Sequence, residues 1–86
     1  MEPLKVAVVH PADVLSLSGA VEAAQAGIIR PVLVGPEAKI RKVAEDAHID
    51  LGPYEIISTP HSHAAAATAV ELANLGRVEA LMKGKL

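Results

Sequence analysis

The stretch Leu-Lys-Val-Ala-Val-Val-His-Pro-Ala-Asp, residues 4–13, decides the fold of this chain. It begins as a short apolar, β-branched run, which is typical of a buried strand, and the run stops at His10. Pro11 cannot donate to a sheet ladder, and it favours an extended conformation for His10. Asp13 stands where its carboxylate can accept hydrogen bonds from the first turn of a helix. The stretch therefore predicts a strand, a tight loop and the start of a helix.

The rest of the chain repeats this alternation of strand and helix. Strands are predicted over residues 5–9, 31–34, 54–58 and 78–82, and helices over residues 14–26, 37–47 and 62–75. Gly27 and Gly76 are expected to end the first and third helices. Pro36 is well placed as the first residue of the second helix. Either Thr59 or Ser62 can cap the third.

Each predicted helix carries an apolar stripe at helical spacing, which marks the face that packs on the sheet. The stripes are Leu17, Ala20, Val21 and Ala24; Ile40, Val43, Ala44 and Ala47; and Ala66, Ala69, Val70 and Ala73. Gly19 lies inside the first helix, where glycine costs about 1 kcal/mol relative to alanine. We therefore expect Gly19 to pass close to a neighbouring element or a ligand.

Alternating strands and helices predict a parallel sheet with helices on its faces. We expect one α/β domain over residues 1–86, a three-layer α/β/α, Rossmann-like arrangement with four strands. The strand orders 3-2-1-4 and 2-1-3-4 are both compatible with the chain. We prefer 3-2-1-4, because strand 5–9 is the most apolar and so suits the centre. No helix follows the last strand to cover Leu81 and Met82. We therefore expect a longer parent protein, or a partner that completes the sheet.

Composition excludes several classes of function. The 86 residues are 51% hydrophobic and carry a net charge of −2, which argues against a nucleic-acid backbone as partner. The absence of cysteine excludes a disulfide framework and a thiol nucleophile. No apolar run approaches the ~20 residues needed to span a bilayer, and the first residues lack a signal-peptide pattern. We therefore expect a cytoplasmic protein with no membrane or nucleic-acid partner.

Two loops are the candidate binding site. Lys83-Gly84-Lys85 leaves the last strand, and in the order 3-2-1-4 it lies beside the His10–Asp13 loop at the switch point of the sheet. Gly84 allows a close backbone approach to an anion, and the lysines add positive charge. We therefore predict that His10, Asp13, Lys83 and Gly84 bind a phosphate or a phosphorylated substrate. The alternatives are a solvated terminus for the lysine loop, a solvent-facing imidazole for His10 and a purely capping role for Asp13.

Other motifs carry weaker signals. His61 and His63 lack a third ligand nearby, so they are weak evidence for a metal site. They are better explained as polar residues at a helix end. An alternative is that they lie at the positive end of the helix, near an anion. No metal site is predicted. No strand is followed by a dinucleotide-binding glycine motif, and a P-loop is absent. No Ser/His/Asp set can be assembled, so the catalytic residues stay unassigned.

Taken in order, five stretches of the chain resemble the phosphate acetyl/butyryl transferase family. They are Val-Ala-Val-Val-His-Pro-Ala-Asp (6–13), Leu-Ser-Leu-Ser-Gly-Ala-Val-Glu-Ala-Ala (15–24), Pro-Val-Leu-Val-Gly-Pro-Glu-Ala-Lys-Ile (31–40), Thr-Pro-His-Ser-His-Ala-Ala-Ala-Ala (59–67) and Glu-Ala-Leu-Met-Lys-Gly (79–84). The resemblance covers nearly the whole chain. The ordered set, rather than any single motif, makes it specific.

The resemblance implies an activity and a larger protein. The family transfers an acyl group between coenzyme A and inorganic phosphate, giving acyl phosphate and free coenzyme A. Its fold is similar to that of isocitrate/isopropylmalate dehydrogenase, with two α/β domains and a cleft between them. This chain would be the first part of the N-terminal domain and inactive alone, with acyl-CoA and phosphate as substrates, no resident cofactor and a homo-oligomeric parent.

The resemblance also places residues. It implies that Lys83 and Gly84 face the cleft and that the His10–Asp13 loop lies nearby, whereas the catalytic residues would lie beyond Leu86. The chain departs from the family pattern at Ala12, where cysteine is frequent, and at Lys85, where a small polar residue is usual. A His-Thr pair is expected to continue the loop after Leu86.

Two other hypotheses stay open. The chain could be a free-standing, non-catalytic Rossmann-like module for binding or assembly, dimerising through its last strand. A small sensor of phosphate-sugars or nucleotides rests on fold analogy alone. A native mass well above 8.9 kDa would favour the acyltransferase, and a match to that mass would favour the module.

Overall fold

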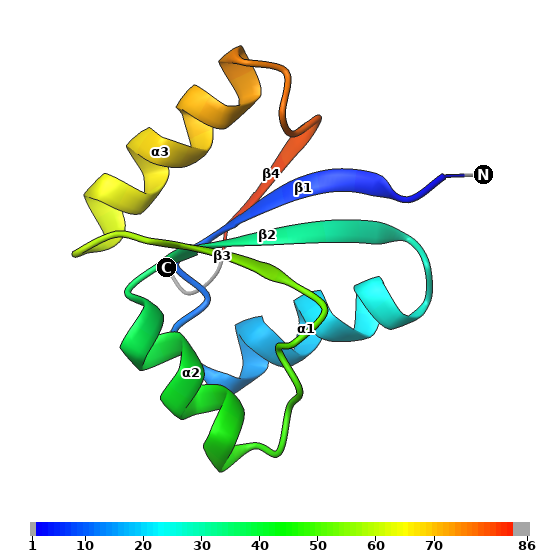
Figure 1. Cartoon of the computed structure of the whole chain (residues 1–86), viewed down its shortest axis with the longest axis vertical. Helices are drawn as coiled ribbons and strands as arrows, with labels where there is room; N and C mark the ends of the chain where they lie inside the picture. The colour runs from blue at the N-terminus through cyan, green and yellow to red at the C-terminus, as the bar shows by residue number, and fades with distance from the viewer. Residues whose placement is uncertain (1, 84–86) are drawn as a thin grey trace.

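The computed structural model describes residues 2–83, which form four strands and three helices (Figure 1). In chain order these are β1 (Leu4–Val9), α1 (Val14–Gln25), β2 (Ile29–Gly35), α2 (Glu37–Asp46), β3 (Glu55–Ser58), α3 (Ser62–Asn74) and β4 (Ala80–Lys83). The predicted alternation is therefore confirmed. The largest differences are in two strands: β2 begins two residues earlier than predicted, at Ile29, and β4 begins two residues later, because residues 78–79 still belong to the connection from α3.

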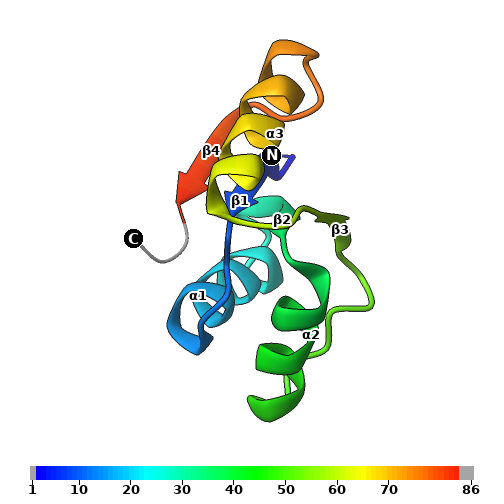
Figure 2. The same cartoon turned by 90° about the vertical axis from the view of Figure 1, so that its left-hand side faces the viewer.

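All neighbouring strands are parallel, in the order β3-β2-β1-β4, so the preferred order 3-2-1-4 is confirmed. Helices α1 and α2 lie on one face of the sheet and α3 lies on the other (Figures 1 and 2). The predicted three-layer α/β/α arrangement is thus correct. The chain changes direction across the sheet between β3 and β4, which places β4 next to β1.

The core consists of two clusters, one on each face of the sheet. Val6 and Val8 point toward α1 and α2, where they meet Leu17, Leu33 and Ile40. The alternate residues of the strands point toward α3, and the cluster there is Ala7, Val34, Ala65, Ala69, Leu72 and Val78. Both faces of β1 are therefore buried. This double burial explains why β1 is continuously apolar from Val6 to Val9.

The predicted inner face of α3 is wrong. Ala69 is buried as expected, but Ala66, Val70 and Ala73 are exposed, and the helix packs through Ala65, Ala69 and Leu72. Residues 64–67 are all alanine, so periodicity alone does not orient this part of the helix. Leu72 has the largest side chain among the three packing residues. Its burial, together with that of Ala65 and Ala69, defines the orientation of the helix.

The helix ends agree with most of the predictions. Asp13 is the N-cap of α1 and accepts a hydrogen bond from the Ser16 amide. Gly27 and Gly76 follow α1 and α3 with φ of +75° and +76°, a conformation that favours glycine. Pro36 is the N-cap of α2 rather than its first residue.

Two local expectations are contradicted. His61, and neither Thr59 nor Ser62, is the N-cap of α3. An added Cβ at Gly19 would meet nothing within 4 Å, so no neighbouring element explains this glycine.

The last strand is only partly covered. Leu81 faces the α3 side and is 45% exposed. Met82 is half-buried, because it packs against the cluster beneath α1 and α2. The expected poor coverage therefore applies to Leu81 and less to Met82.

Candidate functional site at the carboxyl edge of the sheet

The carboxyl ends of β1, β2 and β3 are joined to one another by backbone hydrogen bonds. The His10 amide donates to the Val34 carbonyl oxygen at 2.7 Å, and the Thr59 amide donates to the Gly35 carbonyl oxygen at 2.8 Å. Each bond extends the sheet by one step beyond the strand that precedes it. The residues that follow the three strands are consequently held in a fixed row.

His10 is the most constrained residue of this row. Its φ is +54°, an uncommon conformation for a residue with a side chain. Its carbonyl oxygen accepts a hydrogen bond from the Ala12 amide at 2.8 Å, which closes the loop around Pro11. The imidazole Nδ1 is buried and has no hydrogen-bond partner among the described residues. A bound molecule or water would satisfy this nitrogen.

Gly35 permits the close approach between β2 and the His10 loop. An added Cβ at Gly35 would lie 3.3 Å from the His10 Cα and 3.2 Å from the Ile40 Cδ1. The first of these neighbours is backbone, so it cannot yield by changing a rotamer. Glycine at this position therefore sets how closely the end of β2 lies to the loop.

The three helices begin at this edge and point their N-termini toward it (Figures 1 and 2). The Asp13 Oδ2 accepts from the Ser16 amide at 3.3 Å in α1, and the His61 Nδ1 accepts from the Ala64 amide at 3.2 Å in α3. At the start of α2 the Ser58 Oγ lies 3.5 Å from the Glu37 amide nitrogen, at the limit of a hydrogen bond. The remaining free amides give the edge a partial positive charge, which favours anions.

Lys83 ends β4 at the same edge. Its Cα is the register partner of Val9, the residue before His10, and its side chain is exposed. The structure therefore brings Lys83, His10 and Asp13 to the adjoining ends of β1 and β4, as the strand order predicts. Gly84, the fourth predicted site residue, and Lys85 lie outside the described residues. That these residues bind substrate stays a prediction.

Thr59 is a candidate that the sequence did not single out for binding. It is 7% exposed, and its Oγ1 is buried without a hydrogen-bond partner in the described part of the chain. A capping role would have satisfied this hydroxyl, but His61 takes that role. The available signal was its position directly after β3, because residues after parallel strands gather at one edge.

The two histidines of α3 behave as residues of a helix end. Their ring centroids lie 6.1 Å apart in an edge-to-face arrangement, and His61 uses its Nδ1 for capping. Within residues 2–83, no three side chains of His, Cys, Asp or Glu gather as a metal site requires. None of the helices there has both the length and the apolar character to cross a membrane.

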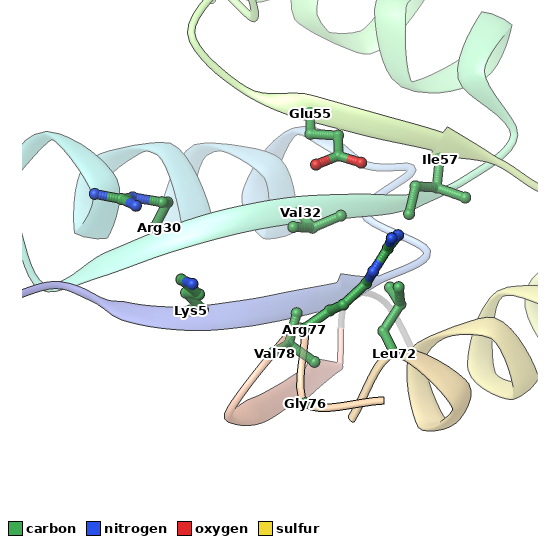
Figure 3. Close-up of a pocket in the computed structure, with 9 residues that line it drawn as sticks. All are labelled: Lys5, Arg30, Val32, Glu55, Ile57, Leu72, Gly76, Arg77 and Val78. Carbon is green, nitrogen blue, oxygen red and sulfur yellow. The ribbon is translucent and has the colours of Figure 1, made fainter. Parts of the chain in front are cut away.

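A hollow in the described residues lies elsewhere. It has a volume of about 400 Å³ and lies at the amino ends of the strands, next to Lys5 and Arg30 (Figure 3). The carboxyl edge, by contrast, is open to solvent at Lys83 and half-buried at His10 and Asp13. This edge is an open surface rather than an enclosed pocket.

Comparison with known proteins identifies relatives along nearly the whole chain. The sequence is 58% identical over 84 residues to the phosphate acetyltransferase of Rhizobium meliloti. The match covers 98% of this chain and 27% of that protein. It is 54% identical over 85 residues to the phosphate acetyltransferase of Rickettsia felis, covering 99% of this chain and 24% of that protein. No protein-family model matches the chain.

A more distant relative has a different acyl group in its name. The phosphate butyryltransferase of Clostridium beijerinckii is 35% identical over 80 residues, covering 93% of this chain and 26% of that protein. The chain thus spans about a quarter of the length of the curated relatives it matches. The resemblance to the phosphate acetyl/butyryl transferase family is confirmed for a segment of this size.

Proposed function

We propose that this chain, which is homologous to an N-terminal portion of the phosphate acetyl- and butyryltransferases, forms one wall of an acyl-transfer site. The observation that carries the proposal is the identity of 58% over 84 residues, which covers 98% of this chain. In the full-length enzyme the acyl group moves between coenzyme A and inorganic phosphate. Both substrates enter as small molecules, and no resident cofactor takes part.

The chemistry requires positioning and charge stabilisation. A phosphate oxygen attacks the thioester carbonyl carbon, the carbon–sulfur bond breaks, and the thiolate of coenzyme A takes up a proton. Two dissolved molecules must be held in line for this attack, and a fixed orientation contributes several kcal/mol to the barrier reduction. Negative charge develops on the carbonyl oxygen, and hydrogen-bond donors aimed at it stabilise the transition state.

The carboxyl edge supplies groups of the required kind for an anion. The Lys83 ammonium provides a full positive charge, and the N-termini of the helices provide partial charges. The Thr59 hydroxyl and the His10 imidazole add polar atoms that have no partner among residues 2–83. Asp13 orders the loop by capping α1. We assign Lys83, His10 and Thr59 to anion binding, with Gly84 as the site of close backbone approach.

Substitution of Lys83 tests this assignment in the full-length enzyme. Lys83→Ala removes the charge at the end of β4 and is expected to lower kcat/KM for phosphate by about 10- to 100-fold, the range for loss of a charged hydrogen bond. The matched control is Lys39→Ala, because Lys39 lies on the exposed face of α2. Equal, small effects of the two substitutions would exclude Lys83 from the site.

The acyl group is proposed to be acetyl. The relatives named phosphate acetyltransferase are 52–58% identical to this chain, whereas those named phosphate butyryltransferase are 35% identical. The test compares kcat/KM for acetyl-CoA and butyryl-CoA with the same phosphate concentration. A higher kcat/KM for butyryl-CoA than for acetyl-CoA would contradict the proposal that the acyl group is acetyl.

A cytoplasmic location and a homo-oligomeric state are part of the same proposal. Cell fractionation and the native mass of the full-length protein test them. The competing hypothesis, a free-standing binding or assembly module, requires a native chain mass equal to the 8.9 kDa of these residues. It also requires that this chain form a defined oligomer without further segments.

A further inference from the structure

A basic groove lies on the α3 face of the sheet, at the end opposite the candidate site (Figure 3). The charged residues of this basic groove are Lys5, Arg30, Arg77 and Glu55. Its floor includes Val32 and Ile57. These residues come from β1, β2, β3 and the connection between α3 and β4. The groove thus runs across the sheet beside α3.

The positive charges of the basic groove are only partly balanced within the described residues. Lys5 and Arg30 are register partners on neighbouring strands and line the same hollow. Like charges at directly opposed positions of a sheet repel each other. Within residues 2–83, none of the four charged side chains forms a salt bridge or side-chain hydrogen bond. Three cations and one carboxylate leave a net charge of +2.

The floor of the groove is apolar and incompletely covered. Val32 and Ile57 are half-buried and pack against the edge of the cluster beneath α3. Helix α3 packs on β1, β2 and β4, which leaves the side of β3 that carries Glu55 and Ile57 at the margin of this layer. Parallel sheets are usually covered by helices on both faces.

We propose that the basic groove binds an amphipathic helix with acidic side chains, contributed by the part of the full-length protein outside these 86 residues. This proposal rests on the proposed function, because the curated relatives are about four times as long as this chain. Apolar residues of the helix cover Val32 and Ile57. Its carboxylates pair with Arg30 and Arg77, which relieves the repulsion between Lys5 and Arg30. A helix packed beside α3 at an axial distance of roughly 8–10 Å completes the layer.

Zero-length crosslinking in the full-length protein tests the docking directly. A carbodiimide joins an amine to a carboxylate only where the two groups touch, and Lys5 supplies the amine of the groove. We expect Lys5, and the new amine of an Arg30→Lys variant, to join carboxylates of one helical segment outside residues 1–86. Lys39, on the exposed face of α2, is the control and should not join that segment.

The crosslinks can also overturn the proposal. Links from the groove only to Glu55, or none while Lys39 reacts elsewhere, would show that no acidic segment lies there. A mixture of isotopically light and heavy protein distinguishes crosslinks within one chain from crosslinks between two copies. Links between a light and a heavy chain would show that a second copy occupies the groove. Crosslinking is read on the folded protein whether or not it releases coenzyme A. Failure of the docking and failure of the proposed function are therefore distinguishable.

Charge reversal provides a second readout. The double substitution Arg30→Glu and Arg77→Glu is expected to lower the melting temperature of the full-length protein by roughly 2–4 °C or more. The matched control, Lys39→Glu with Lys42→Glu on the exposed face of α2, should change it by less. An unchanged or raised melting temperature in the groove variant would contradict the pairing with acidic side chains.

Discussion

At the residue scale, the close approach between β2 and the His10 loop depends on Gly35. Gly35→Ala would place a Cβ 3.3 Å from the His10 Cα, and overpacking of this kind typically costs about 1–3 kcal/mol. Gly19→Ala is the matched control, because an added Cβ there meets nothing within 4 Å inside α1. It should stabilise the protein by about 0.5–1 kcal/mol. Urea denaturation measures both, and a neutral Gly35→Ala would contradict the tight contact.

The cap of α3 is a second residue-scale feature. His61→Ala removes the Nδ1 acceptor of the Ala64 amide and is expected to lower the free energy of unfolding by about 0.5–2 kcal/mol. His61→Ser should retain most of the stability, since serine is a favourable N-cap. His63→Ala, two residues away and exposed, is the control. If both alanine variants lose the same stability, the cap is not responsible.

The roles of individual residues are the part of this structure that the sequence predicts least. The Asp13 cap was predictable, because aspartate at the start of a periodic segment is a common signal. The cap by His61 was not, since histidine is a rare N-cap and Thr59 and Ser62 are better candidates by type. Thr59 was not predictable as a site residue, because its hydroxyl lacks a partner among the described residues only when His61 caps α3.

At the element scale, the orientation of α3 can be tested by adding volume. Ala65 is 0% exposed between α3 and the sheet, so Ala65→Leu should destabilise the protein by about 1–3 kcal/mol. Ala66 is exposed one position along, and Ala66→Leu should change stability by less than about 0.5 kcal/mol. A larger loss of stability in Ala66→Leu than in Ala65→Leu would instead support the packing face of α3 that was predicted from the sequence, which includes Ala66.

Elements whose ends are marked by proline or glycine were predictable. The packing of a helix made largely of alanine was not. Proline and glycine bound β1, β2 and α1, and charged residues on α2 mark its exposed face, so these elements were predicted, although β2 begins two residues earlier than expected. The salt bridge between Arg41 and Glu37, 2.8 Å long, follows from the same four-residue spacing. In α3, a run of four alanines carries no preference for a face. Only tertiary packing of Leu72 resolves it.

At the scale of the whole molecule, the strand order β3-β2-β1-β4 determines where a ligand can bind. It sets Lys83 beside the His10 loop, although the two are far apart in the sequence. The order was predictable because β1 is apolar on both faces and so suits a central position. The basic groove was not predicted, because Lys5, Arg30, Glu55 and Arg77 are scattered in the sequence and meet only across the folded sheet.

We propose that this chain is part of an enzyme that transfers an acyl group between coenzyme A and phosphate. The most direct measurement is the release of free coenzyme A from acetyl-CoA by the full-length protein, with and without inorganic phosphate. We predict release that requires phosphate and is accompanied by an equal amount of acetyl phosphate. Release that is independent of phosphate, or none from a folded protein several times the 8.9 kDa mass of this chain, would contradict the claim.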